Sequence, residues 1–340
     1  MDQKRLDALL ERFSSLRIAL AGDLFLDRWY EIDPALDEPS LETGKTAWQI
    51  VRKRAAPGAG GTVLNNLSAM GIGYLRAISM TGDDGDGWEL RQLLKRRRVD
   101  TGDVFSDGSI ATPSYIKPLF PEEGNRLDIK NFSPTPRAME DRIIDAIGRA
   151  AQEMDAVILL DQVTQENCGV LTDRVRQAVA GIAEEHPGTL FFADSRAFID
   201  RFRSVVIKCN NYEAAQMTGK QAEEQAFSPE DVFDSMTRLA KRTGRPVVIT
   251  CNKHGIAVEE GGRRCILPAV RHHGPIDICG AGDASTAGFV STLCAGGSMA
   301  EAAEIANLTA GVTVRKLGQT GTATQEEIRA LYFESCGFGS

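Results

Sequence analysis

The stretch AVILLD, residues 156–161, is apolar at every position except its last. Such a run is typical of a strand in a parallel sheet that is covered on both faces, because neither side of the strand meets water. Five other runs have the same character: RIALAG (17–22), YLRAISMTG (74–82), TLFFAD (189–194), VVIKCN (205–210) and VVITCN (247–252). We therefore expect all of these runs to form buried, parallel strands.

Longer segments with a helical pattern alternate with these runs. They are MEDRIIDAIGRAAQE (139–153), PEDVFDSMTRLAKRTG (229–244), DASTAGFVSTLCAGG (283–297) and MAEAAEIANLTAGVTVRKLG (299–318). The alternation predicts an α/β fold with a doubly wound, mostly parallel sheet and helices on both of its faces. In an open parallel sheet, ligands bind beyond the carboxyl ends of the strands, so the polar residues at those ends are the candidates for a functional site.

Two segments depart from this rhythm. Residues 28–57 and 112–133 are more polar and alternate in character, as in TAWQIVRK (46–53) and PSYIKPLF (113–120). We expect them to form a few antiparallel strands that stand off the main sheet as a small lid. On this interpretation residues 1–340 are a single domain with two lid segments.

Composition excludes several classes of function. The formal net charge of -8 argues against a nucleic-acid-binding surface. No apolar run approaches the roughly 18 residues that a membrane span needs. The N-terminal sequence MDQKRLDALLERF is charged and amphipathic rather than typical of a signal peptide, which favours a cytoplasmic location. The 7 cysteines have no C-x-x-C spacing, which indicates reduced thiols.

Two glycine motifs are incomplete. TGKTAW (43–48) ends like a phosphate-binding loop, but Pro39 stands where the first glycine is needed and no buried strand precedes it. GAGGTV (58–63) begins like a dinucleotide-binding fingerprint, but Val63 stands at the position of the third glycine. A dehydrogenase based on this second motif is therefore disfavoured.

The motif GAGD, Gly280 to Asp283, has better support because it precedes a convincing helix. We expect the free N–H groups of Gly280, Ala281 and Gly282 to face outward together with the helix dipole, where they could hold a phosphate. Asp283 would then lie beside the bound phosphoryl group and could remove a proton there. An aspartate after a glycine turn can also simply cap the helix, and the motif alone leaves both readings open.

A second polar motif, Asn210-x-x-Glu213, follows the strand at 205–210. An amide and a carboxylate suit Mg²⁺ on a polyphosphate, because this ion keeps much of its hydration. The alternative is a capping box at the start of a helix.

A third group of polar residues lies near the N-terminus. Asp27 follows the first strand, and Gly60, Gly61 and Asn65 stand at a boundary between a turn and a helix. A carboxylate, an amide and open backbone together suit a polyol.

In their order and spacing these motifs resemble the ribokinase-like (PfkB) family of carbohydrate kinases, from Gly22 to about Gly318. The resemblance implies that Asp283 is the general base, that Gly280, Ala281 and Gly282 form the anion hole, and that Asn210 and Glu213 hold Mg²⁺. It implies that the sugar is bound by Asp27, Gly60, Gly61 and Asn65. It also implies that ATP is bound by Asp194, Thr250, Gly255 and Asn307, and that Asp277 lies beside a K⁺ ion. For Asn307 a buried helix amide is the alternative. Arg196 either helps to hold phosphate or Mg²⁺, or it stabilises the fold alone.

Within the family, three runs look most similar to bacterial D-glycero-D-manno-heptose 7-phosphate kinases: GDLFLDRWY (22–30), RLDIKNF (126–132) and ANLTAGVTVRKLGQTGT (306–322). Lys117 and Arg126 in the lid are then candidates to bind a phosphate that the substrate already carries, unless they are merely exposed strand charges. Asn252 departs from the family, which commonly has glycine there. The resemblance also implies a homodimer through the lid. A kinase for another sugar or a nucleoside, and a catalytically inactive nucleotide- or sugar-binding relative, stay open.

Overall fold

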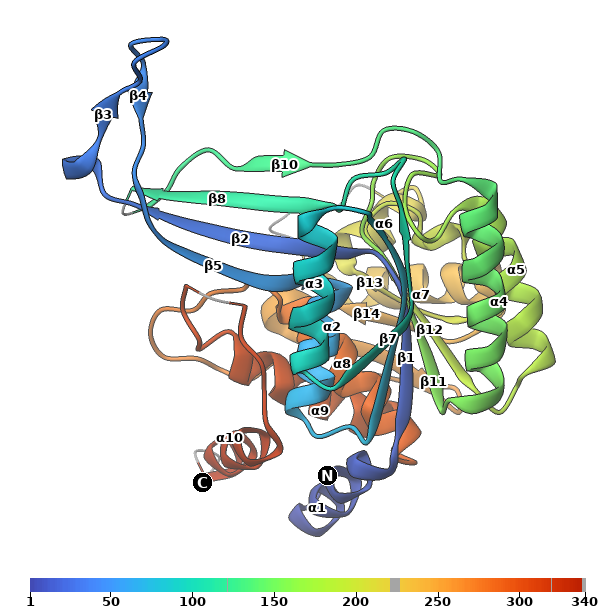
Figure 1. The fold of residues 1–340 in the computed structure, drawn as a ribbon. Helices are drawn as coiled ribbons and strands as arrows, with labels where there is room; N and C mark the ends of the chain where they lie inside the picture. Colours follow the sequence, from blue (N-terminus) through green and yellow to red (C-terminus); the bar gives the residue numbers. More distant parts are fainter. Residues whose placement is uncertain (121, 221–226, 319, 338–340) are drawn as a thin grey trace.

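The computed structural model describes residues 1–120, 122–220, 227–318 and 320–337 (Figure 1). Within them a 9-stranded sheet has the order β16-β15-β14-β13-β12-β11-β1-β6-β7. Its strands are β1 (Arg17–Gly22), β6 (Tyr74–Gly82), β7 (Val99–Asp107), β11 (Ala156–Asp161), β12 (Leu190–Ser195), β13 (Val206–Asn210), β14 (Val247–Thr250), β15 (Ile256–Glu260) and β16 (Arg263–Leu267). From β7 to β14 all neighbours are parallel, which confirms the predicted sheet.

Side chains of the central strands alternate between two separate hydrophobic cores. In β11, Ala156, Ile158 and Leu160 belong to one core, whereas Val157 and Leu159 belong to the other. Because both faces are covered, an apolar residue is favourable at every position, and this explains the unbroken apolar runs in the sequence.

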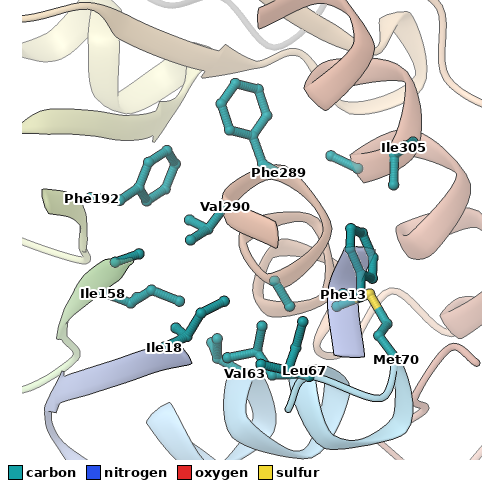
Figure 2. Close-up of a cluster of buried hydrophobic side chains, with 14 of the residues drawn as sticks. Phe13, Ile18, Val63, Leu67, Met70, Ile158, Phe192, Phe289, Val290 and Ile305 are labelled. Atoms are coloured by element: carbon teal, nitrogen blue, oxygen red, sulfur yellow. The ribbon is translucent and has the colours of Figure 1, made fainter. Parts of the chain in front are cut away.

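The helices divide between the two faces of the sheet. Their bounds are α1 (Gln3–Arg12), α2 (Gly60–Ala69), α3 (Gly85–Arg96), α4 (Arg137–Glu153), α5 (Asp173–Glu185), α6 (Asn211–Met217), α7 (Pro229–Thr243), α8 (Ala281–Cys294), α9 (Met299–Thr313) and α10 (Gln325–Gly337). Helices α4, α5 and α7 contribute to one core, and α2, α8 and α9 to the other. In this second core, side chains of α2 and α8 pack against those of the central strands from one side, and α9 lies beyond α8 (Figure 2). In the described part of the chain, none of these helices is both long and apolar enough to cross a membrane.

Three sheet strands were not anticipated. β7 lies at one edge of the sheet and is half-exposed and polar, so its sequence lacks the apolar run of a central strand. β15 and β16 form an antiparallel extension at the opposite edge. Several predicted helix limits also differ. Helix α8 spans Ala281–Cys294 rather than 283–297, and α9 ends at Thr313 rather than Gly318. Helix α4 begins at Arg137 rather than Met139, and α7 ends at Thr243 rather than Gly244.

A second sheet forms the lid, which extends away from the body (Figure 1). Its strands are β2 (Leu24–Ile32), β5 (Ile50–Ala59), β8 (Ser114–Phe120), β9 (Glu122–Glu123) and β10 (Leu127–Ile129), and a small hairpin of β3 (Glu38–Pro39) and β4 (Thr46–Ala47) lies at the far end. The lid therefore begins at Leu24 rather than at residue 28.

The lid contains the predicted antiparallel strands, as in the pair of β8 and β10, but β2 and β8 pair in parallel, which the sequence did not indicate. The strand β2 follows β1 after Asp23, and β8 follows β7 after a short connection. Since β1 and β7 both belong to the parallel part of the main sheet, both lid strands leave its carboxyl edge in the same direction. The pair β2 and β5 is antiparallel as expected.

Candidate active site

Asp283 lies in the first turn of α8, beyond the carboxyl edge of the sheet. The N-cap of this helix is Gly280, which has a φ of 79° and provides no side-chain cap. Asp283 is the third residue of the helix, so the alternative in which this aspartate caps α8 is wrong. Among the described residues, the Asp283 carboxylate forms no hydrogen bond and no ion pair.

The turn before α8 supplies part of the predicted anion hole. The N–H of Ala281 donates to the carbonyl of Ile278 at 3.1 Å, so it closes the turn and does not face outward as expected. Within the described ranges, the N–H groups of Gly280, Gly282 and Asp283 donate to no protein acceptor. The open donors at this helix start are therefore those of Gly280, Gly282 and Asp283.

The environment of Asp283 favours its protonated form. Burial, and after it the nearby carboxylate of Asp194, raise the pKa of Asp283 to about 7, although Lys208 and Arg196 oppose the shift. Asp27 contributes further in the raising direction. A carboxyl group with a pKa near the working pH is well matched to general base catalysis, because it can both accept and release a proton.

A buried lysine lies beneath the turn. Lys208, on β13, is 5% exposed, and its ammonium nitrogen lies 2.5 Å from Oδ2 of Asp194. The hydroxyl of Thr286 on α8 lies 3.1 Å from the same oxygen. A Cβ atom added at Gly282 would lie 3.9 Å from the Lys208 ammonium.

These contacts make Lys208 the buried counter-charge of the site. Burial alone would lower the pKa of Lys208, but the carboxylates of Asp194, Asp283 and Glu213 outweigh this effect and raise it. Sequence reasoning missed Lys208. The available signal was a lysine inside the apolar run VVIKC, because a buried charge requires a partner.

Asn210 and Glu213 form a capping box at the start of α6. Oδ1 of Asn210 accepts from the N–H of Glu213 at 2.9 Å, and Oε2 of Glu213 accepts from the N–H of Asn210 at 2.8 Å. Burial raises the pKa of Glu213, although the hydrogen bond from Asn210 opposes it. The capping alternative is thus confirmed, and a role toward Mg²⁺ stays a prediction, since the cap uses only one carboxylate oxygen.

The residues predicted to bind a sugar lie where the lid meets the body. Asp27 is on β2, and a Cβ atom at Gly58 of the neighbouring β5 would lie 2.6 Å from its carboxylate. Burial raises the pKa of Asp27, and the cations Lys117 and Arg126 oppose the shift.

At the start of α2, the two predicted glycines are needed for packing. A Cβ atom at Gly60 would meet the side chain of Leu20 at 2.7 Å, and one at Gly61 would meet Pro57 at 2.3 Å. Asn65 is only 9% exposed, yet its Oδ1 has no hydrogen-bond partner among the described residues. Such a buried orphan acceptor is what a ligand hydroxyl would satisfy.

The two cations predicted in the lid differ in their surroundings. Lys117 lies 5.0 Å over the ring of Trp29. Arg126 forms two hydrogen bonds with Asp128, at 2.6 and 2.9 Å, and lies over the ring of Tyr115.

Three of the four predicted nucleotide residues lie around the ends of β14 and β16, whereas the fourth, Asp194, lies on β12 in its ion pair with Lys208. Thr250 donates to the carbonyl of Cys209 at 3.4 Å. Gly255 has a φ of 103°, and a Cβ atom there would clash with the carbonyl oxygen of Leu267 at 1.8 Å. The side-chain amide of Asn307 donates to the same carbonyl at 2.9 Å, which confirms its alternative as a buried structural amide. Contact of any of these residues with ATP stays a prediction.

Asp277, the residue predicted beside K⁺, bridges two segments of the same region. Its carboxylate accepts from the N–H of Cys279 at 3.0 Å and from the N–H of Gly318 at 3.2 Å. It therefore fixes the approach to the turn before α8, and its role toward an ion stays a prediction.

One of the two incomplete glycine motifs lies in the lid, and the other lies where the lid meets the body. Lys45 is in the turn between β3 and β4, so no helix follows it as a phosphate-binding loop requires. The GAGG motif joins the lid strand β5 to α2, and this strand is not part of the central sheet. The structure thus confirms that neither motif has its required context.

Solved structures with the same fold include Arabidopsis thaliana ribokinase complexed with ribose and ATP, at 15% identity and a TM-score of 0.67, covering 93% of this chain and 98% of that chain. Phosphofructokinase-2 from Escherichia coli, in complex with potassium, is 14% identical with a TM-score of 0.71, and 94% of this chain and 99% of that chain are covered. At these identities the similarity establishes the fold alone.

Curated relatives include the bifunctional protein HldE of Trichlorobacter lovleyi, which is 26% identical over 332 residues, covering 97% of this chain and 65% of the relative. The HldE protein of Gluconacetobacter diazotrophicus is 30% identical over 335 residues, covering 94% of this chain and 64% of the relative. The chain thus spans less than two thirds of these relatives. The model of the pfkB family of carbohydrate kinases matches residues 149–326, which is more than half of the chain. The chain therefore belongs to the pfkB family of carbohydrate kinases.

Proposed function

We propose that this carbohydrate kinase transfers the γ-phosphoryl group of ATP to a hydroxyl of a sugar phosphate, with a heptose 7-phosphate as substrate. One observation carries the proposal: Asp283 is an unpaired carboxylate with a raised pKa, next to the open N–H groups of a helix start. A base beside an anion site is the arrangement that phosphoryl transfer to a hydroxyl requires.

Each part of the site has a distinct task in this mechanism. The N–H groups of Gly280 and Gly282 stabilise negative charge on the transferring phosphoryl group, since they are fixed before the reaction. Asp283 accepts the proton of the sugar hydroxyl as the new P–O bond forms. Lys208 offsets the negative charge of the surrounding carboxylates, so that Asp283 can ionise when the substrate binds.

The proposal includes ATP and Mg²⁺ as cofactors. The described residues contain no cluster of three or more side chains that could hold a metal ion by themselves. The pair of Asn210 and Glu213 suits Mg²⁺, because this ion keeps several waters and takes its other ligands from phosphates and one or two carboxylates. Glu213 and Asn210 would orient its water ligands. A K⁺ ion beside Asp277 belongs to the same proposal.

The substrate assignment rests on the sequence similarity to heptose 7-phosphate kinases and on the positive charge of the lid. Asp27 and Asn65 would bind hydroxyls of the sugar, and Lys117 and Arg126 supply positive potential on the lid. We further propose a cytoplasmic enzyme with one domain that dimerises through the lid, where Trp48 and Val51 are exposed.

The decisive experiment compares wild type with Asp283→Asn in an ADP-release assay over hexoses, pentoses, nucleosides and hexose and heptose phosphates. A general base typically contributes about 10²–10⁴-fold, so kcat should fall by that factor while the KM for the sugar changes little. ATP binding should persist, because the substitution removes a negative charge near the phosphates.

Two outcomes would contradict the proposal in different ways. An Asp283→Asn enzyme that turns over within a few-fold of wild type would remove Asp283 from the mechanism. A wild type that prefers an unphosphorylated sugar or a nucleoside, by kcat/KM, would refute the sugar-phosphate assignment but leave the kinase mechanism intact. No turnover with any acceptor would favour an inactive binding protein.

A further inference from the structure

A pocket lies between the lid and the loop that follows β11. Its walls include Phe25 and Tyr115 from the lid, Lys130 after β10, Gln162 and Thr164 after β11, and Arg196 after β12. We infer that this pocket receives the phosphate group that the sugar substrate already carries, with Arg196 and Lys130 as its cations. The inference rests on the proposed function and specifies which residues select a phosphorylated sugar.

Arg196 is positioned at the boundary between the pocket and the reacting centre. Its backbone N–H donates to the carbonyl of Asp161 at 2.9 Å, which holds the residue at the strand end. Its guanidinium lowers the pKa of Asp283 and of Glu213, although burial raises the pKa of both groups overall. Among the described residues, the Arg196 side chain forms no hydrogen bond and no ion pair, so its charge is available to a ligand. A guanidinium binds a phosphate through two parallel hydrogen bonds.

Lys130 supplies the second cation and is only partly neutralised. Its ammonium lies 3.3 Å from Oδ2 of Asp128 and 5.6 Å from the ring centre of Tyr115. Asp128 is already bound by Arg126 through both carboxylate oxygens. One carboxylate thus serves two cations, which leaves net positive charge at the pocket.

The loop after β11, which forms the opposite wall of the pocket, is held in place by a buried carboxylate. The buried carboxylate of Asp23 accepts from the N–H groups of Gln162 at 2.8 Å, Val163 at 2.9 Å and Val170 at 2.8 Å. Three hydrogen bonds to one buried carboxylate fix both ends of this loop. A wall that is fixed before binding lowers the ordering cost of holding a ligand.

The arrangement of the lid face gives the sugar a direction. Asp27 and Phe25 lie on the same face of β2, about 7 Å apart by strand geometry. Phe25 packs edge-on against Tyr115, with ring centres 5.0 Å apart. A sugar whose reacting hydroxyl meets Asp283 and whose ring lies on Asp27 would therefore extend its far end over Phe25 into the pocket. This geometry selects a phosphate at the end of the carbon chain opposite the reacting hydroxyl.

The two lid cations are less suited to direct contact with that phosphate. Arg126 is occupied by its bidentate pair with Asp128. Burial raises the pKa of Asp27 and of Cys279, and the nearby charge of Lys117 opposes both shifts. Since Cys279 directly precedes the N-cap of α8, Lys117 lies on the side of the reacting centre.

The test compares kcat/KM for D-glycero-D-manno-heptose 7-phosphate and for the same heptose without phosphate, in wild type, Arg196→Gln and Lys130→Gln. The matched control is Arg174→Gln, which makes the same charge change at a surface arginine paired with Glu140 and Asp141. Arg196→Gln should lower the ratio of kcat/KM for the phosphorylated sugar to kcat/KM for the other sugar by about 10-fold or more. Because Arg196 also lowers the pKa of Asp283, its removal changes the ionisation of the base for both sugars alike, and that change cancels in the ratio. Lys130→Gln should act in the same direction, and the control should match wild type on both sugars.

A second measurement uses inorganic phosphate as a competitor of the sugar phosphate at saturating Mg-ATP. Its inhibition constant should rise in Arg196→Gln and Lys130→Gln and stay unchanged in the control. Equal losses on both sugars, or unchanged competition by phosphate, would overturn the inference while the proposed function stands. If wild type itself prefers the unphosphorylated sugar, the proposed function fails first, before any variant is compared. Thermal unfolding of each variant checks that a loss reflects binding and not folding.

Discussion

The ammonium group of Lys208 lies 2.5 Å from a carboxylate oxygen of Asp194, and this pair is buried directly beneath the turn that begins α8. The pair joins β12 to β13, which are adjacent parallel strands. It brings one positive charge into a region that also contains the carboxylates of Asp283 and Glu213. The electrostatics of the candidate site therefore depend on a residue outside every motif that identified it.

Lys208→Met should destabilise the fold and alter catalysis. Removing one partner of a buried ion pair typically costs about 3–5 kcal/mol, because the other charge stays buried without compensation. Since Lys208 opposes the raised pKa of Asp283, the acid limb of the kcat–pH profile should also move to higher pH. Urea unfolding and the pH profile measure the two effects. The double variant Lys208→Met/Asp194→Asn should recover part of the stability, and additive losses would contradict the pairing.

Asp283→Asn should stabilise the protein at pH 8 but not at pH 4. Folding raises the pKa of Asp283 from about 4 to about 7. The native carboxyl thus keeps its proton over a range where the unfolded chain has lost it, and stability falls as the pH rises through this range. The substitution removes that loss, which is on the order of a few kcal/mol. Urea unfolding at both pH values measures the difference.

Asp128→Asn provides the control of opposite sign. Its hydrogen bonds with Arg126 lower the pKa of Asp128, so its contribution to stability is present at neutral pH and is lost as the pH falls. This variant should be less stable than wild type at pH 8 and equal to it at strongly acid pH. The same sign for both variants would argue against the titration explanation.

Glu213→Gln distinguishes the role of Glu213 in capping α6 from its proposed role toward Mg²⁺. A glutamine oxygen can still accept the hydrogen bond from the Asn210 N–H, so thermal stability should change little. The amide lacks the negative charge that attracts Mg²⁺, and the Mg²⁺ concentration for half-maximal activity should rise by about 10-fold or more. A variant with lower stability but an unchanged Mg²⁺ requirement would show that Glu213 serves the fold alone.

The neighbours Asn65 and Asn66 should respond in opposite ways to alanine substitution. Oδ1 of Asn65 has no partner in the described part of the chain, so Asn65→Ala should lower kcat/KM for the sugar by roughly 10-fold with little loss of stability. Asn66 donates to the carbonyl of Thr62 and accepts from the N–H of Ala323. Asn66→Ala should therefore lower the free energy of unfolding by roughly 2–3 kcal/mol. Urea unfolding measures the stability of both variants, and initial-rate kinetics measure their kcat/KM. If Asn65→Ala lost stability and Asn66→Ala lost activity, the roles assigned to the two residues would be exchanged.

The parts of the fold that the sequence predicts are those with a local signal. Runs such as 156–161 are apolar throughout because two cores enclose them, and that pattern is visible without coordinates. The edge strand β7 carries no such signal, since one of its sides meets water. The parallel pairing of β2 and β8 joins segments about 90 residues apart and follows from the directions of β1 and β7, not from either lid sequence.

The candidate site, like the fold, has features that the sequence predicts and features that only the structure reveals. Spacing and residue type alone place Asp283 at a glycine turn before a helix, because a turn and a helix start are properties of neighbouring residues. Whether that aspartate caps the helix depends on where the helix begins, and only the structure assigns the cap to Gly280 and the N–H of Ala281 to Ile278. The pairing of Lys208 with Asp194 and the pocket at Arg196 and Lys130 also require the tertiary structure. Charges that interact through space come from strands and loops far apart in the chain, so no local pattern of residues can reveal which of them meet.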